Sequence, residues 1–241
     1  MTADPGQNAG SKSLPARIVG VLLAPKATYA DVAARPRVLG ALAVVLLVSM
    51  AGTFAFLSTE VGKQAMVDQQ VRTLESFGVK MTDAAYDRIE QSADRGRYFG
   101  ALGQLISLPL MALIIAGLTF AVFNAIMGGD ATFKQVYAVV VHSGVIIAVQ
   151  QLFVLPLDYV RETMSSPTNL MVFLPFLDES SFMARLLGSI DLFVIWWGLN
   201  LAIGLGVLYR KRTAPIATTL IVIYVAIGLI IAAVKTATSG A

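Results

Sequence analysis

The stretch ALGQLISLPLMALIIAGLTFAVFNAIM, residues 101–127, decides the fold because it contains no charged residue. An α-helix rises ~1.5 Å per residue, so ~20 apolar residues cross the ~30 Å hydrocarbon core of a bilayer. The stretch therefore predicts a transmembrane helix that is long enough to tilt or to project beyond the bilayer. Pro109 inside it predicts a kink.

Four other apolar stretches of the chain are also long enough to cross a bilayer. The composition agrees, with 56% hydrophobic residues, 14% charged residues and a mean hydropathy of +0.73. A soluble domain of this size could not bury so much apolar surface. We expect an all-α polytopic membrane protein with a five-helix transmembrane bundle, its spans lying at about 38–58, 98–127, 133–155, 190–209 and 215–234.

Residues 59–97 form a polar insert after the first span, and their pattern predicts an extramembrane helical hairpin. Gly78 suits the end of its first helix and Thr82 the start of its second. The insert is too short to bury a core of its own. Residues 235–241 complete the chain as a short tail.

Residues 1–37 are expected to form an N-terminal segment that does not span the membrane, its first 13 residues being polar and disordered. Two short helices are predicted after them, the first ended by Pro25 and the second capped by Thr28. The apolar residues of the first helix share one face. This pattern suits either an amphipathic helix in the membrane interface or a helix packed under the bundle.

The orientation depends on where the basic residues lie, because each side of the membrane receives nine of the 18 lysines and arginines. The triplet Arg210-Lys211-Arg212 falls in a very short turn, where the positive-inside bias counts most. We therefore expect a cytoplasmic N-terminus and an extracytoplasmic C-terminus. The polar start of the chain does not have the pattern of a cleavable signal peptide.

The chain has few side chains that are suited to catalysis or metal binding. The chain has no cysteine, and His142 is its only histidine, which excludes a histidine cluster for a metal within one chain. No phosphate-binding glycine loop, zinc-protease motif or serine-hydrolase motif occurs. We expect no enzymatic activity, no catalytic residue, no cofactor and no metal site. The basic residues flank the spans, so they indicate contact with membrane lipids rather than nucleic acid.

Five polar residues inside the predicted spans carry an energetic cost unless they are paired: Gln104, Asn124, His142, Gln150 and Asn200. They could form a polar path or a substrate pocket around His142 and Asn200. Alternatively, they could form interhelical hydrogen bonds worth about 0.6–2 kcal/mol each. The second interpretation is favoured because no charged residue lies at mid-depth. We expect His142 and Asn200 to satisfy each other.

Small residues repeat every four positions on two spans, and such stripes let helix backbones approach closely. They could form a dimer face, but packing within one chain is favoured because the two stripes could meet each other. Leucine at either of the two glycines that begin these stripes should then damage folding. The stripes are Gly117, Ala121 and Ala125 on the second span, and Gly198, Ala202 and Gly206 on the fourth.

Two segments carry a family resemblance. The first is VLLAPKATY, residues 21–29. The second is residues 120–137, where Phe123-Asn124 closes one span and GGDATFK (residues 128–134) leads into the next. Both resemble the bacterial branch of the YIP (Ypt-interacting protein) family of five-span membrane proteins. Members often have a proline in the third span, where this chain has HSGV at residues 142–145.

The resemblance implies a cytosolic N-terminus and supplies no catalytic residues. Eukaryotic relatives bind prenylated Rab GTPases, a partner that a bacterial member would lack. We expect a non-enzymatic inner-membrane protein that acts as an interaction or membrane-organising module. Its expected partners are membrane lipids, and also proteins or further copies of the chain bound through the small-residue stripes. The alternative is a small transporter or lipid-handling protein with a polar site between the third and fourth spans.

Overall fold

The computed structural model describes residues 12–238, and the expectation for the first residues of the chain lies mostly outside this range. Within it the chain is built from helices joined by short turns and one longer loop. They are α1 (Leu14–Leu23), α2 (Pro25–Ala34), α3 (Leu39–Leu57), α4 (Glu60–Ser76), α5 (Asp83–Phe120), the π-helix η1 (Ala121–Ile126), α6 (Phe133–Ser143), α7 (Val145–Arg161), the 3-10 helix η2 (Leu170–Phe173), α8 (Phe182–Gly188), α9 (Leu192–Leu208) and α10 (Thr213–Thr238).

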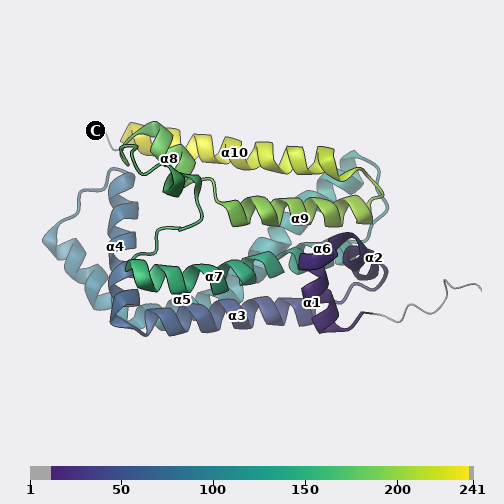
Figure 1. Ribbon diagram of the computed structural model, residues 1–241, viewed down its shortest axis with the longest axis horizontal. Helices are drawn as coiled ribbons and strands as arrows, with labels where there is room; N and C mark the ends of the chain where they lie inside the picture. Colours follow the sequence, from purple (N-terminus) through teal and green to yellow (C-terminus); the bar gives the residue numbers. More distant parts are fainter. Residues whose placement is uncertain (1–11, 239–241) are drawn as a thin grey trace, which may run out of the picture.

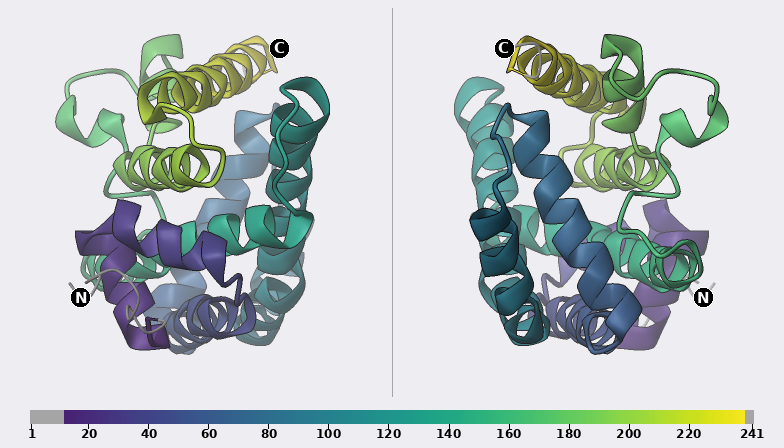
Figure 2. Two further views of the ribbon diagram at one scale, coloured as in Figure 1. Left: turned by 90° about the vertical axis from the view of Figure 1, so that its right-hand side faces the viewer. Right: turned by 90° about the vertical axis from the view of Figure 1, so that its left-hand side faces the viewer.

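Helices α3, α7, α9 and α10 run side by side along the longest axis of the molecule, and α5 crosses behind them obliquely (Figure 1). Helices α10, α9, α7 and α3 are stacked in that order, and α5 flanks α3 (Figure 2). Helices α1 and α2 lie at one end together with the α9–α10 turn, and we call this the foot end. Helices α4 and α8 lie toward the opposite end (Figure 1).

Four helical stretches are long and apolar enough to cross a membrane: α3, α5 with η1, α6 with α7, and α10. Helix α9, the predicted fourth span, is equally apolar but has 17 residues. The all-α membrane bundle is therefore confirmed, whereas the count of five spans stays a prediction.

The predicted helix boundaries inside the insert are confirmed at Gly78 and Thr82. Gly78 adopts a positive φ of 81° just after α4, a conformation that a glycine accepts at little cost. Thr82 caps α5 by accepting a hydrogen bond from the backbone N–H of Ala85. Helix α5 then continues without interruption into the second predicted span, so the second arm of the hairpin and that span are one helix.

The third predicted span is broken at Gly144, between α6 and α7, although no proline lies there. The backbone N–H of Gly144 donates to the carbonyls of both Val140 and Val141, which tightens the last turn of α6. The predicted end before Pro156 is wrong, because α7 runs through this proline to Arg161. Proline removes one backbone donor, and here the neighbouring turns keep the helix intact.

Pro25 begins α2, where the missing N–H of a proline would have no helical partner in any case. The predicted cap at Thr28 is therefore wrong, and Thr28 is a buried residue inside α2. Val21, Tyr29 and Val32 lie in the main core with α6 and α9. The two short helices are thus packed against the bundle, as one of the two alternatives expected.

Candidate functional site

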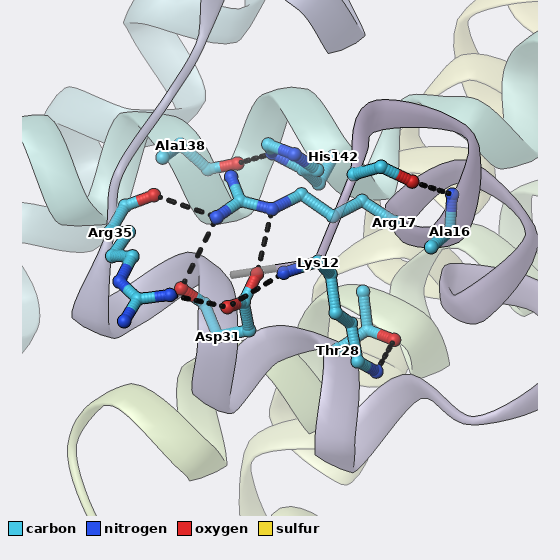
Figure 3. A network of polar contacts seen from close by, with 9 residues as sticks. Lys12, Ala16, Arg17, Thr28, Asp31, Arg35, Ala138 and His142 are labelled. Carbon is cyan, nitrogen blue, oxygen red and sulfur yellow. Dashed lines mark hydrogen bonds and ion pairs between the residues drawn. The ribbon is translucent and has the colours of Figure 1, made fainter. Parts of the chain in front are cut away.

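A group of polar side chains joins the two foot helices to each other beside α6 of the bundle (Figure 3). Arg17 of α1 is only 2% exposed, and its Nε donates to Oδ2 of Asp31 on α2 at 2.8 Å. A buried arginine needs such a partner because taking an unpaired charge out of water costs several kcal/mol. The two short helices are therefore joined by an ion pair that is largely shielded from solvent.

Arg17 also closes the end of α2. Its Nη2 donates to the carbonyl oxygens of Arg35 at 3.1 Å and Asp31 at 3.5 Å. The last carbonyls of a helix have no helical donors and carry the negative end of the helix dipole. A guanidinium, with five donors in a planar fork, can satisfy a carboxylate and these carbonyls together.

Asp31 is the only acidic residue between Lys12 and the end of α3, and three cations surround it. Besides Arg17, the guanidinium of Arg35 lies 3.9 Å from its Oδ1. The backbone N–H of Lys12 donates to Oδ1 at 3.4 Å, and the Lys12 ammonium donates to Thr28 at 3.0 Å. This foot centre, made by Lys12, Arg17, Asp31 and Arg35, has more positive than negative charge.

Asn200 of α9 connects the foot to the middle of the bundle. It accepts a short hydrogen bond from the hydroxyl of Tyr29 and donates to the carbonyl of Val21 at 2.9 Å. Burial raises the pKa of Tyr29, so its hydroxyl stays protonated and acts as a donor. The amide of Asn200 thus binds both foot helices at once.

The expected pair of His142 and Asn200 is not formed. Nδ1 of His142 lies 2.7 Å from the carbonyl oxygen of Ala138, one turn earlier in α6, and Nε2 has no hydrogen-bond partner in the described part of the chain. Partners for Asn200 were predicted only among the spans, so the foot groups that bind it were missed. Leucine at His142 would therefore not leave Asn200 unpaired.

The polar residues on the second span and on α7 connect neighbouring helices. Gln104 of α5 donates to the hydroxyl of Thr53 on α3 at 2.7 Å. Gln150 of α7 donates at 3.3 Å to Asp191, the residue that precedes α9. These contacts have the geometry expected for interhelical hydrogen bonds.

Asn124, in the π-helix η1, shapes the turn at residues 127–132. Its Nδ2 donates to the carbonyl of Ala131 at 2.7 Å, and its Oδ1 accepts from the hydroxyl of Tyr209 at 2.6 Å. The ring of Tyr209 stacks on Phe123 with 4.6 Å between centroids. A side chain at Gly129 would meet this ring, which explains the glycine in the turn. The segment that carries the family resemblance therefore attaches this turn to the end of α9.

A second buried carboxylate, Asp191, caps α9. It accepts from the backbone N–H of Phe193 at 2.8 Å and from the hydroxyls of Ser166 at 2.5 Å and Thr168 at 2.7 Å. The hydroxyl of Tyr224 on α10 accepts from the N–H of Asp191 at 2.8 Å. The Asp191 centre thus attaches the loop before α9 to α7, α9 and α10.

The small-residue stripes do not meet, because α6 packs against both α5 and α9. Ala121 and Ala125 are exposed, and a Cβ added at Gly117 or Gly198 would contact nothing within 4 Å. Gly117→Leu and Gly198→Leu are therefore not expected to damage folding by separating the two stripes. Ala202 is fully buried, and a Cβ at Gly206 would lie 3.0 Å from the Thr213 hydroxyl, at the turn into α10.

The close helix approach occurs instead at Gly204. A Cβ there would lie 2.6 Å from Val139 of α6 and 3.0 Å from the ring of Tyr29. Gly204 lies four residues after Asn200, so the two share the face of α9 that receives the foot. Gly204 was not predicted, because the small-residue stripe of the fourth span was selected by periodicity alone. This helix is apolar on every side, so periodicity does not identify the face that packs.

Arg17, Asp31 and Tyr29 were likewise not among the candidates predicted from the sequence. One signal was present, since Asp31 is a single acid among five basic residues between positions 12 and 37. An isolated carboxylate in such a segment indicates an ion pair, but its partner cannot be selected from spacing. The position of Tyr29 against Asn200, 171 residues away, required the folded structure.

Residues 19–234 match a family model described as the Yip1 domain. No curated protein and no solved structure matches the chain. The matched region begins inside α1 and ends inside α10, so it includes the second half of α1, all of α2 and nearly all of the stacked bundle.

Proposed function

The chain belongs to the Yip1-domain family, and we propose that it is a non-enzymatic integral membrane protein that acts as an interaction or membrane-organising module. In this proposal the foot helices α1 and α2 form the interacting part. The bundle of long helices holds them at one end of the molecule (Figure 1). The membrane placement follows from the four long apolar helices.

The observation that carries the proposal is that both the oxygen and the nitrogen of the Asn200 side-chain amide are hydrogen-bonded to the foot. A transport site needs polar groups that are free to bind a substrate, whereas both ends of this amide are bound by foot groups, Tyr29 and the carbonyl of Val21. Arg17 and Asp31 are likewise occupied with each other. The polar groups at this end therefore support a fixed foot rather than a passage.

The proposed topology has five crossings, with α9 as the fourth and the foot end in the cytoplasm of a bacterial cell. A helix of 17 residues is ~25 Å long, which is close to the thickness of the hydrocarbon core. The basic turn at 210–212 supports the orientation. A reporter after Ala241 should read as extracytoplasmic, and one in the 210–212 turn as cytoplasmic. A cytoplasmic signal from both would contradict the topology.

Purification in a mild detergent, with identification of bound proteins, tests the interaction role. Ala30 on α2 and Ala84 on α5 are both exposed, and they lie toward opposite ends of the molecule. We expect Ala30→Glu to lose proteins that co-purify with the wild type, because it puts a charge on the foot. Ala84→Glu is the matched control and should keep them. Equal retention by both variants would contradict an interaction role for the foot.

The transporter alternative is favoured by one observation, the Nε2 of the buried His142, which has no hydrogen-bond partner among residues 12–238. A proton-coupled transporter would need this titratable group. We expect His142→Gln, which keeps hydrogen-bonding capacity, to leave the cellular phenotype nearly intact. Loss of the phenotype in a variant that still inserts and folds would put the transporter ahead.

A further inference from the structure

The two ends of the molecule carry opposite net charge. The foot end, comprising residues 12–38, 127–134 and 209–214, has nine basic residues against two acidic ones, Asp31 and Asp130, for a net charge of +7. The other residues that the structure describes include nine basic residues against twelve acidic ones, for a net charge of −3. A uniform surface would not divide the charges in this way.

Most of the positive charge at the foot end is available to solvent. Seven of the nine basic side chains are exposed, and the one ion pair that any of them forms in the described part of the chain is the 3.9 Å contact of Arg35 with Asp31. Asp130 is the single exposed acid at this end. The exposed cations are Lys26, Arg35, Arg37, Lys134, Arg210, Lys211 and Arg212.

Helix α1 adds apolar groups to this basic end. It lies across the direction of the long helices (Figure 1) and exposes Leu23 by 80% and Val19 by 52%. A helix in this orientation lies in the plane of a membrane whose normal follows the bundle. Its apolar side chains can then enter the acyl boundary while neighbouring cations remain at the headgroups.

The two turns of the foot end enclose a polar pocket of about 200 Å³. Its lining includes Asp130, Gln135, Tyr209 and Arg210. A guanidinium binds a phosphate oxygen through charge-assisted hydrogen bonds. The carboxylate of Asp130 can accept from hydroxyl groups, whereas the amide oxygen of Gln135 already accepts from the backbone N–H and the hydroxyl of Thr132. The pocket therefore suits a phosphodiester that also carries hydroxyls.

We propose that the foot end is a binding surface for anionic phospholipids of the phosphatidylglycerol class. The phosphodiester lies against the exposed cations, the glycerol hydroxyls reach Asp130, and α1 enters the acyl boundary. The proposal rests on the membrane placement given under Proposed function, but it requires no protein partner. It can therefore hold where the interaction role fails, and it can fail where that role holds.

Purified protein in a mild detergent can be titrated with short-chain phosphatidylglycerol, phosphatidylethanolamine or phosphatidylcholine, and with glycerol phosphate as the headgroup without acyl chains. We expect phosphatidylglycerol to raise the melting temperature at the lowest concentration and the effect to weaken with salt. Neutralising three cations should reduce its apparent affinity on the order of tenfold or more. The variant is Arg210→Gln/Lys211→Gln/Arg212→Gln.

The matched control, Lys80→Gln/Arg88→Gln/Arg95→Gln, removes three exposed cations from the opposite end and should bind like the wild type. Arg210→Lys/Arg212→Lys keeps the charge and should retain binding, which separates loss of charge from misfolding. Three outcomes would overturn the proposal: equal shifts from all three lipids, a shift from glycerol phosphate as large as that from the lipid, or equal losses in both triple variants. Capture of an acidic protein segment in place of the lipid would also contradict it.

Discussion

Asp31 on α2 and Asp191 before α9 are both largely shielded from solvent, and the protein holds them in different ways. Asp31 is paired with a buried cation, Arg17, at 2.8 Å. No ion pair is formed by Asp191 in the described part of the chain, where hydroxyls and the first N–H groups of α9 bind it instead. The first solution places a counter-ion in the interior, and the second uses neutral donors and the helix dipole.

The difference predicts opposite responses to substitution. When one member of a buried ion pair is removed, the remaining charge is uncompensated, so each partner alone is critical. A carboxylate held by neutral donors can lose its charge and keep much of its geometry. The foot centre should therefore be fragile toward single changes, and the Asp191 centre should tolerate an amide.

The largest effect is expected from Arg17→Met, which leaves Asp31 without its buried partner. We expect the free energy of unfolding in detergent to fall by about 3–5 kcal/mol. The double variant Arg17→Met/Asp31→Leu removes both charges and should recover part of this loss. Thermal melts of the two variants beside Asp31→Leu measure the coupling. Additive losses would show that the pair is not the critical contact.

The next largest effect tests the neutral donors around Asp191. Asp191→Ala removes the cap of α9 and leaves the hydroxyls of Ser166 and Thr168 without their acceptor, so we expect a loss of about 2 kcal/mol. Asp191→Asn keeps the shape and one acceptor and should cost less than about 1 kcal/mol. If the amide variant melts as low as the alanine variant, then the charge itself holds this centre.

A smaller effect should come from the close helix approach beside the foot centre. Gly204→Ala places a Cβ 2.6 Å from Val139, a branched side chain with little freedom, so we expect a loss of about 1–3 kcal/mol. Gly198→Ala, in the same helix, meets open space and should be nearly neutral. Equal melting temperatures for the two variants would contradict the fit of α2 against α9.

The smallest effect is expected from an exposed ion pair toward the opposite end. Lys63 lies 2.9 Å from both Glu60 and Asp94, a distance close to that of the foot pair, but these acids are 82% or more exposed. Hydrogen bonds to Asp94 and Glu60 raise the pKa of Lys63, so any contribution exists at neutral pH and is lost only as the pH rises through this pKa. We expect Lys63→Gln to melt like the wild type, because solvent and salt screen such pairs. A clear drop in melting temperature would show that the short nitrogen–oxygen distance matters more than the exposure of the pair to solvent.

Hydropathy predicted the long helices well because a bilayer imposes a minimum length on any apolar segment that crosses it. Local chemistry also predicted the turn at Gly78 and the cap at Thr82. The foot was harder to predict because Thr28 and Pro25 are compatible with several helix starts. The partners of Asn200 could not be predicted from the sequence. An amide carries no signal for which donor or acceptor, 171 or 179 residues away, will bind it.

The long sequence separation between the foot and Asn200 has a consequence for biogenesis. The ribosome makes Val21 and Tyr29 at the start of synthesis, whereas their partner on α9 emerges only near the end of translation. The Arg17–Asp31 pair joins residues 14 positions apart and can form at once, so α1 and α2 can associate early as a unit. Their docking can be completed only after α9 has been made, because α2 packs against α9 as well as against α6. A chain truncated before α9 would therefore leave the Tyr29 hydroxyl and the Val21 carbonyl without their Asn200 partner, and the face of this unit that packs on α9 would be open to proteolysis.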